Sequence, residues 1–216
     1  MIDEKDELTI KAFPWEGENY ARGCLGCKIM ILGESSYGPQ PLGYDHRKEC
    51  IALANDAIGY DNGEWNKSRF YTRIARIFGF DPHKREDRKR FWQSVSYYNY
   101  LIGQQPGPRT CPAESLWLEA NEPFLEIVND MKPDVVFAFS QRMWNYIGKN
   151  GNAVNLNIPC AIFMRSNCLN REDGGKTLLI GFKHPCGRAF VWQSYSKPVQ
   201  EIISGNILNT YKLNTD

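Results

Sequence analysis

Two kinds of hydrophobic pattern alternate along the chain. The first is a short, unbroken run of apolar residues, which is typical of a strand buried on both faces of a sheet. A polar or glycine-containing turn follows most of these runs and marks the end of the strand. The runs predict strands at residues 28–32, 95–102, 135–140 and 177–183, with a further candidate at 160–164.

The second pattern places apolar residues three to four positions apart, as in an amphipathic helix. Within residues 68–80, Phe70, Ile74, Ile77 and Phe78 form one stripe, and arginines occupy the other side. Similar spacing predicts further helices, of which the last is expected to be interrupted near Pro198, because proline lacks the amide hydrogen that a helix needs. These helices are expected at residues 45–58, 114–131, 141–147 and 189–208.

Strands that are separated by helices pair in parallel through right-handed crossovers. We therefore expect an α/β fold, a three-layer α/β/α sandwich with a central, mostly parallel sheet of four or five strands. A length of 216 residues suits one domain over residues 1–216. Within it, residues 1–22 are interpreted as an N-terminal extension, whose aromatic part is expected to pack over the sheet edge, and residues 39–63 as an insertion.

Composition narrows the class of protein. Hydrophobic residues make up 42% of the chain and charged residues 24%, as in a globular domain. No apolar run approaches the roughly 20 residues that span a bilayer, and the first ten residues are acidic and polar rather than basic and apolar. We therefore expect a cytoplasmic protein without a membrane partner, and a monomer.

Charge and cysteine content limit the partners. The net charge of +1 gives no overall attraction to a polyanion, so nucleic acid would have to be bound by a local patch. Residues 83–90 are basic but interrupted by acids, which favours a solvated helical face over a phosphate clamp. The seven cysteines are scattered and odd in number, which indicates reduced thiols. Cys24 and Cys27 have the spacing of metal ligands, but no second such pair exists, so we predict neither a metal site nor a cofactor and leave open whether these two bind a metal.

Polar groups follow three of the predicted strands. Glu34 lies in the turn after the first strand, Asn99 near the end of the second and His184 just after the last. The carboxyl ends of parallel strands share one edge of a sheet, where ligands usually bind, so we expect these groups to face one crevice. The alternatives are an ordinary strand-to-helix turn with a serine cap, an asparagine bonded to its own backbone and a structural histidine.

Three motifs occur in the order and at the strand ends that characterise a known family. They are GESSYG at residues 33–38, YYNY at 97–100 and HPCGRAF at 184–190, and with them the chain resembles the uracil-DNA glycosylase superfamily. In addition, NYLIGQQPGPR at 99–109 is similar to a segment of the iron–sulfur branch. SRFYTRIARIFGF at 68–80 is similar to the helix that follows the base-stacking loop of the mismatch-specific branch. The resemblance covers residues 28–188.

The resemblance implies roles for individual residues. Glu34 would orient water and stabilise positive charge on the sugar, His184 would donate a hydrogen bond to the base oxygen, and Asn99 would pair with the edge of a flipped base. A flipped base is also stacked on aromatic rings. Further base-binding candidates are Tyr37, Ser35, Tyr60 and Trp65, and the candidates for contact with DNA are Ser36, Arg109, Ser140, Cys186, Gly187 and Arg188.

The chain also departs from the family. Its acid, Glu34, stands one place earlier than the acid or amide of the best-known branches, whose position is Ser35 here. The iron–sulfur branch also has its acid at the earlier place, but the cysteines that bind its cluster do not carry over to this chain. The long segment 39–63 suits a larger pocket and a bulkier base. We expect a monofunctional DNA glycosylase that uses water, without excluding lyase activity through Lys183. Its target is expected to be uracil or a modified cytosine, such as the glucosylated hydroxymethylcytosine of phage DNA, in single- or double-stranded DNA, in repair or antiviral defence.

Three alternatives remain open at this stage. One is a non-catalytic sensor of DNA or nucleotides with the same fold, suggested by Ser35 where the family usually has an acid. Another is a Gly-Asp-Ser-type serine hydrolase with Ser35 as nucleophile and His184 as base, although Gly181 stands where that class has an aspartate. The third is Cys186 as a nucleophile beside His184, although residues two apart seldom face each other.

Overall fold

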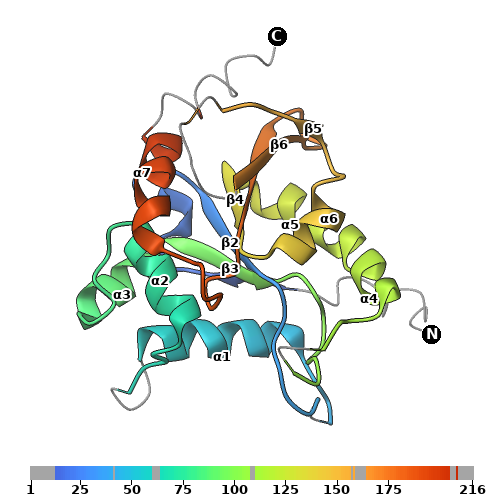
Figure 1. Ribbon diagram of the computed structural model, residues 1–216, viewed down its shortest axis with the longest axis horizontal. Coiled ribbons are helices and arrows are strands. Elements are labelled where there is room, and N and C mark those ends of the chain that lie inside the picture. The colour runs from blue at the N-terminus through green and yellow to red at the C-terminus, as the bar shows by residue number, and fades with distance from the viewer. Residues whose placement is uncertain are drawn as a thin grey trace, which may run out of the picture.

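The computed structural model describes residues 13–40, 42–59, 64–107, 110–156, 158, 164–204 and 208. The described chain forms an α/β fold with one mixed sheet of seven strands in the order β1-β3-β2-β4-β7-β6-β5 (Figure 1). We expected four or five strands. The strands are β1 (Trp15–Glu16), β2 (Ile29–Gly33), β3 (Val95–Asn99), β4 (Val135–Ala138), β5 (Asn152–Ala153), β6 (Met164–Asn170) and β7 (Lys176–Phe182).

Four neighbouring strands pair in parallel, in the order β3, β2, β4 and β7. The flanking strands are antiparallel: β1 pairs with β3 at one edge, and β6 and β5 follow β7 at the other. The aromatic segment near residue 15 therefore extends the sheet as an edge strand. The strand candidate at 160–164 begins instead at Met164, and residues 159–163 lie outside the described residues.

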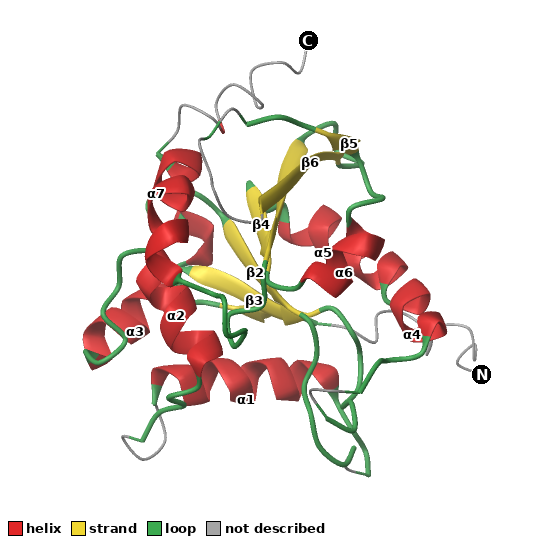
Figure 2. Ribbon diagram, viewed as in Figure 1, coloured by secondary structure: helices red, strands yellow, loops and turns green. Residues whose placement is uncertain are grey.

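The helices are α1 (His46–Ile58), α2 (Arg69–Ile77), α3 (Arg85–Trp92), α4 (Glu114–Glu119), α5 (Asn121–Met131), α6 (Gln141–Ile147) and α7 (Trp192–Ile203), with a 3-10 turn at Tyr20–Arg22 (Figure 2). None of the helices in the described ranges is long and apolar enough to cross a bilayer. Asp45 caps α1 by accepting hydrogen bonds from the amides of Arg47 and Lys48.

Two helix predictions were wrong, and in both cases a proline is involved. The single helix expected at 114–131 is divided at Ala120, because Pro123 cannot donate to the carbonyl of Glu119 and so belongs to the first turn of a new helix. The last helix, in contrast, runs through Pro198 without interruption. Tyr195, Val199 and Ile202 of this helix are buried, and that packing outweighs the one hydrogen bond that Pro198 cannot make.

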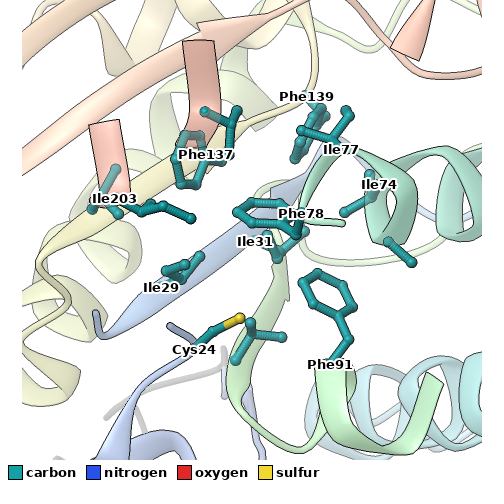
Figure 3. Packing of buried hydrophobic residues seen from close by; sticks show 14 of the residues in the cluster. Cys24, Ile29, Ile31, Ile74, Ile77, Phe78, Phe91, Phe137, Phe139 and Ile203 are labelled. Atoms are coloured by element: carbon teal, nitrogen blue, oxygen red, sulfur yellow. The ribbon is translucent and has the colours of Figure 1, made fainter. Parts of the chain in front are cut away.

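Helices cover both faces of the sheet. On one face, α1, α2, α3 and α7 pack against alternate strand residues, among them Ile29 and Ile31 of β2 and Phe137 of β4 (Figure 3). On the other face, α4, α5 and α6 pack against the intervening residues, such as Met30 and Leu32. This alternation follows from the two-residue period of a strand, and it explains why the runs in β2, β3 and β4 contain only buried residues.

The chain leaves adjacent strands β2 and β4 in opposite directions. After β2 it enters α1 on one face, whereas after β4 it enters α6 on the other face. Such a switch in direction opens a crevice beyond the carboxyl ends of the two strands, and ligands of open α/β sheets bind there. The fold therefore places Glu34, directly after β2, opposite the residues that follow β4.

Candidate functional site

Two adjoining hollows lie at the carboxyl edge of the parallel strands. The first, of about 420 Å³, is lined by Glu34, Asn99 and His184, so the three groups expected to converge do share one hollow. The second has a volume of about 400 Å³. Four residues line both hollows, namely Glu34, Tyr37, His184 and Cys186. Both volumes fall within the range of small-ligand pockets.

The carboxylate of Glu34 is held by residues that follow β4. Its side chain is 3% exposed and accepts hydrogen bonds from Ser140 Oγ and from both Nε and Nη2 of Arg142, with which it forms an ion pair. Hydrogen bonding to Glu34 raises the pKa of the Arg142 guanidinium, so that side chain stays cationic. Ser140, a predicted DNA contact, is buried, and it also caps α6 by accepting from the amide of Met143 at 3.4 Å.

The turn after β2 is hydrogen-bonded along its length to the segment after β3. The carbonyl oxygens of Gly33 and Glu34 accept from the amides of Tyr100 and Leu101, both at 3.0 Å. Farther along, the carbonyl of Ser36 accepts from the amide of Gln105 at 2.8 Å, and the carbonyl of Gln105 accepts from Gly38 at 3.0 Å. The motif is therefore not a free loop but an extension of the β2–β3 pairing.

The amide of Asn99 is 2% exposed and fixed on both sides. Its Nδ2 donates to Ser36 Oγ at 2.9 Å, and its Oδ1 accepts from the hydroxyl of Tyr97 at 2.9 Å. One N–H and one lone pair remain for a ligand, which is the pattern that matches the edge of a base. A side chain at Gly33 would overlap Asn99 Oδ1, so the glycine of the motif is required by close packing.

The His184 imidazole is a neutral hydrogen-bond donor through Nε2. Its Nδ1 accepts from the amide of Cys186 at 3.2 Å, so the proton of the neutral ring is on Nε2. Burial lowers the pKa of His184, an effect that Glu34 opposes and Arg142 reinforces. The ring packs against Phe70, with centroids 5.6 Å apart. Nε2–H is thus the donor that this histidine can offer to a ligand.

The loop that carries His184 is attached to α2 by Arg73. The Nη1 atom of Arg73 donates to the carbonyl of Pro185 at 2.5 Å and to that of Gly187 at 3.3 Å. A backbone bond from the amide of Gly187 to the carbonyl of His184, 2.9 Å long, closes the turn. Arg73 was not predicted, because in the sequence it belongs to the polar stripe of an ordinary amphipathic helix.

The other predicted base-binding residues are dispersed. Tyr37 lies at the rim, 39% exposed, where burial of the hydroxyl raises its pKa. Ser35 lines the first hollow, and its buried Oγ forms no hydrogen bond with His184, so it lacks the bond that a serine hydrolase requires. Trp65 packs on Arg88 and His83 and does not line either hollow. Tyr60 lies outside the described residues.

The predicted DNA contacts also divide into groups. Ser36 lines the first hollow, and its hydroxyl accepts from Asn99. Cys186 lines both hollows, and its backbone amide donates to His184 Nδ1. The residue as a whole is exposed, but partial burial of the thiol raises its pKa above the usual value. Gly187 lines the second hollow, and Arg188 is exposed on the surface. Arg109 lies outside the described residues.

Several residues of the site were missed in the sequence. Arg142 could have been found, since it lies two positions after Ser140 and the carboxyl-end rule applies to β4 as well. Phe70 was assigned to the core stripe of its helix, but it is only partly buried and lines the first hollow. Glu49 lines the same hollow from α1 and has no sequence signal that distinguishes it from other helical carboxylates.

Cys24 and Cys27 lie away from this site, just before the amino end of β2. They form a tight hairpin with reciprocal backbone hydrogen bonds of 2.8 and 3.1 Å, and the Cys27 thiol donates to the carbonyl of Ile203 at 3.3 Å. Burial raises the pKa of Cys24 to about 11, which disfavours the thiolate that binds metals. Over the ranges that the structure describes, no group of three or more His, Cys, Asp or Glu residues could hold a metal ion.

Protonation of buried histidines will make the fold less stable in mild acid. His46 is 2% exposed, burial lowers its pKa, and its Nε2 donates to the carbonyl of Asn99 at 3.1 Å. An unfolded chain has a histidine pKa of about 6.5. As the pH falls below that value, the unfolded state takes up protons that the folded state resists, so we expect the free energy of unfolding to fall between pH 7 and 5.

Urea denaturation at a series of pH values measures this effect. The His46→Gln variant keeps a donor for the Asn99 carbonyl but cannot titrate, so its unfolding free energy should depend less on pH than that of the wild type. Equal slopes for wild type and His46→Gln would contradict the prediction.

The site thus combines a fixed carboxylate, a fixed amide and a neutral imidazole around one hollow, with a guanidinium behind the carboxylate. Such a set can bind a planar polar ligand, stabilise a developing positive charge and donate a hydrogen bond to a leaving group. In comparisons with known proteins, no protein-family model matches this chain, and no curated protein matches it either.

Proposed function

We propose that the protein is a DNA glycosylase with a uracil-DNA glycosylase-like fold, acting as a monomer on an extruded pyrimidine nucleotide in DNA. It hydrolyses the N-glycosidic bond and leaves an abasic site. One observation carries the proposal: Glu34 and His184 stand at the junction of two adjoining hollows. A base held in one hollow and its sugar in the other would place the bond between them at these two side chains.

The two hollows differ in a way that suits this division. The first is lined by apolar and aromatic side chains, including Leu53, Phe70 and Tyr97, together with the amide of Asn99. A base extruded from the helix is held by ring stacking and by hydrogen bonds to its edge, which these groups provide. The second hollow is lined by Ser140, Arg142 and Gly187, and its guanidinium suits the sugar–phosphate side of a nucleotide.

The residues can divide the chemistry as follows. Cleavage of the bond between C1′ and the base nitrogen leaves positive charge on the sugar and the electron pair on the base. The Glu34 carboxylate stabilises the cation and orients the water whose oxygen bonds to C1′. His184 Nε2–H donates a hydrogen bond to the base oxygen, where negative charge develops, and Asn99 holds the base edge. The proton released by water finally resides on the departed base.

Incubation with defined oligonucleotides tests the proposal. Single- and double-stranded DNA with one uracil, mismatched thymine, 5-hydroxymethylcytosine or glucosylated hydroxymethylcytosine is analysed for free base by mass spectrometry and for abasic sites by alkaline cleavage. We expect release of at least one of these bases. Absence of release from all of them, or equal release by a Glu34→Gln preparation, would overturn the assignment.

One observation favours a second candidate, a non-catalytic sensor with the same pocket. Both carboxylate oxygens of Glu34 are already engaged by Ser140 and Arg142, as in a purely structural ion pair. In that case the protein would bind DNA that carries a modified base or an abasic site with measurable affinity, and it would release no base.

A further inference from the structure

A second carboxylate lines the hollow assigned to the base. Glu49 of α1 shares this hollow with Asn99 and is partly buried. Its Oε2 accepts from the hydroxyl of Tyr44 at 2.6 Å, and its Oε1 accepts from Nε2 of Gln104 at 3.1 Å. Among the residues that the structure describes, no lysine, arginine or histidine forms an ion pair with Glu49.

The two partners of Glu49 are neutral donors, so they orient the carboxylate without cancelling its charge. Tyr44 also accepts from the amide of Gly103 at 3.2 Å, which fixes its hydroxyl. Burial, together with Glu49, raises the pKa of Tyr44, so that hydroxyl keeps its proton and remains a donor. Each carboxylate oxygen has further lone pairs. The wall formed by Glu49 therefore presents hydrogen-bond acceptors to whatever occupies the hollow.

A hydrogen-bond acceptor such as the Glu49 carboxylate can distinguish pyrimidines by the substituent at C4 of the ring. Cytosine carries an amino group at C4, which donates, and Glu is a suitable acceptor for it; uracil and thymine carry a carbonyl oxygen there, which can only accept. We infer that the substrate class is a cytosine-type base with its 4-amino group, and that Glu49 is the residue that selects it against uracil-type bases. This inference rests on the proposed function.

A matched pair of substrates isolates the effect. 5-Hydroxymethylcytosine and 5-hydroxymethyluracil have the same size and differ at the C4 substituent and the protonation of N3, so oligonucleotides that differ only in this base are compared in single-turnover release. We expect faster release of the cytosine-type base, by roughly 10- to 100-fold. Glu49→Gln, whose amide both donates and accepts, should reduce that ratio about tenfold. The same change at an exposed position outside both hollows, Glu119→Gln, should preserve the preference.

Binding by the Glu34→Gln variant separates this inference from the proposed function. If no base is released but the variant still binds the cytosine-type oligonucleotide more tightly, the glycosylase assignment is lost and the role of Glu49 is kept. If both bases are released at equal rates, or if Glu49→Gln leaves the ratio unchanged, the inference about Glu49 is overturned and the glycosylase assignment stands. If no base is released and the variant binds both oligonucleotides equally well, both the glycosylase assignment and the role of Glu49 are overturned.

Discussion

Replacing Glu34 with Gln will slow base release by about a hundredfold or more, the usual loss when a group that stabilises developing charge is removed. The amide has nearly the shape of the carboxylate but no negative charge with which to stabilise the sugar cation. Its oxygen can still accept from Arg142 or Ser140. We therefore expect DNA binding to survive while single-turnover release of free base, followed by mass spectrometry, falls.

The control for this result is Glu119→Gln, the same chemical change at an exposed position at the end of α4. It should release base at the wild-type rate. A Glu34→Gln variant that is as fast as Glu119→Gln would show that the Glu34 carboxylate takes no part in the reaction.

Replacing Arg142 with Ala will destabilise the fold by about 2 kcal/mol. Removal of one partner leaves the buried Glu34 carboxylate without a counter-charge, which typically costs 3–5 kcal/mol in a fully buried pair. The Arg142 side chain is 41% exposed, however, so water replaces part of its effect and the smaller figure applies. The free energy of unfolding in urea measures the loss.

A double variant tests the reason for this loss. With Glu34→Gln also present, no buried charge remains, and we expect most of the stability lost in Arg142→Ala to return. Arg188→Ala, at an exposed arginine, should change stability by less than about 0.5 kcal/mol. If the double variant is as unstable as the sum of the two single variants, the buried charge is not the cause.

The parts of the site that the sequence predicted share one property. Asn99 is the last residue of a buried strand, and Glu34 and His184 come one and two residues after the ends of two others. The direction of each strand determines where the residues at its end emerge. Their meeting at one hollow needed only the parallel order of β3, β2, β4 and β7. The hydrophobic pattern of the strands, together with the rule that ligands bind at the carboxyl ends of parallel strands, was enough to predict this meeting of the three residues.

The parts that were missed depend on packing between elements. Phe70, Arg73 and Glu49 lie on helices, and a helical pattern does not say which turn faces the mouth of the sheet. Strand β6, MRSNCLN, mixes buried and exposed residues, so it has no apolar run to reveal it. The break before α5 follows from Pro123, which the apolar spacing of the region conceals.

The continuous pairing between residues 34–38 and 100–105 has a consequence for how the site accommodates ligands. Glu34, Asn99 and Ser36, whose hydroxyl accepts from the Asn99 amide, belong to one hydrogen-bonded unit, so they cannot shift independently. The opposite wall, with Phe70 and His184, is joined to the rest through side-chain contacts such as those of Arg73. Adjustment to larger or smaller occupants therefore falls to that second wall, while Glu34 and Asn99 keep a constant spacing.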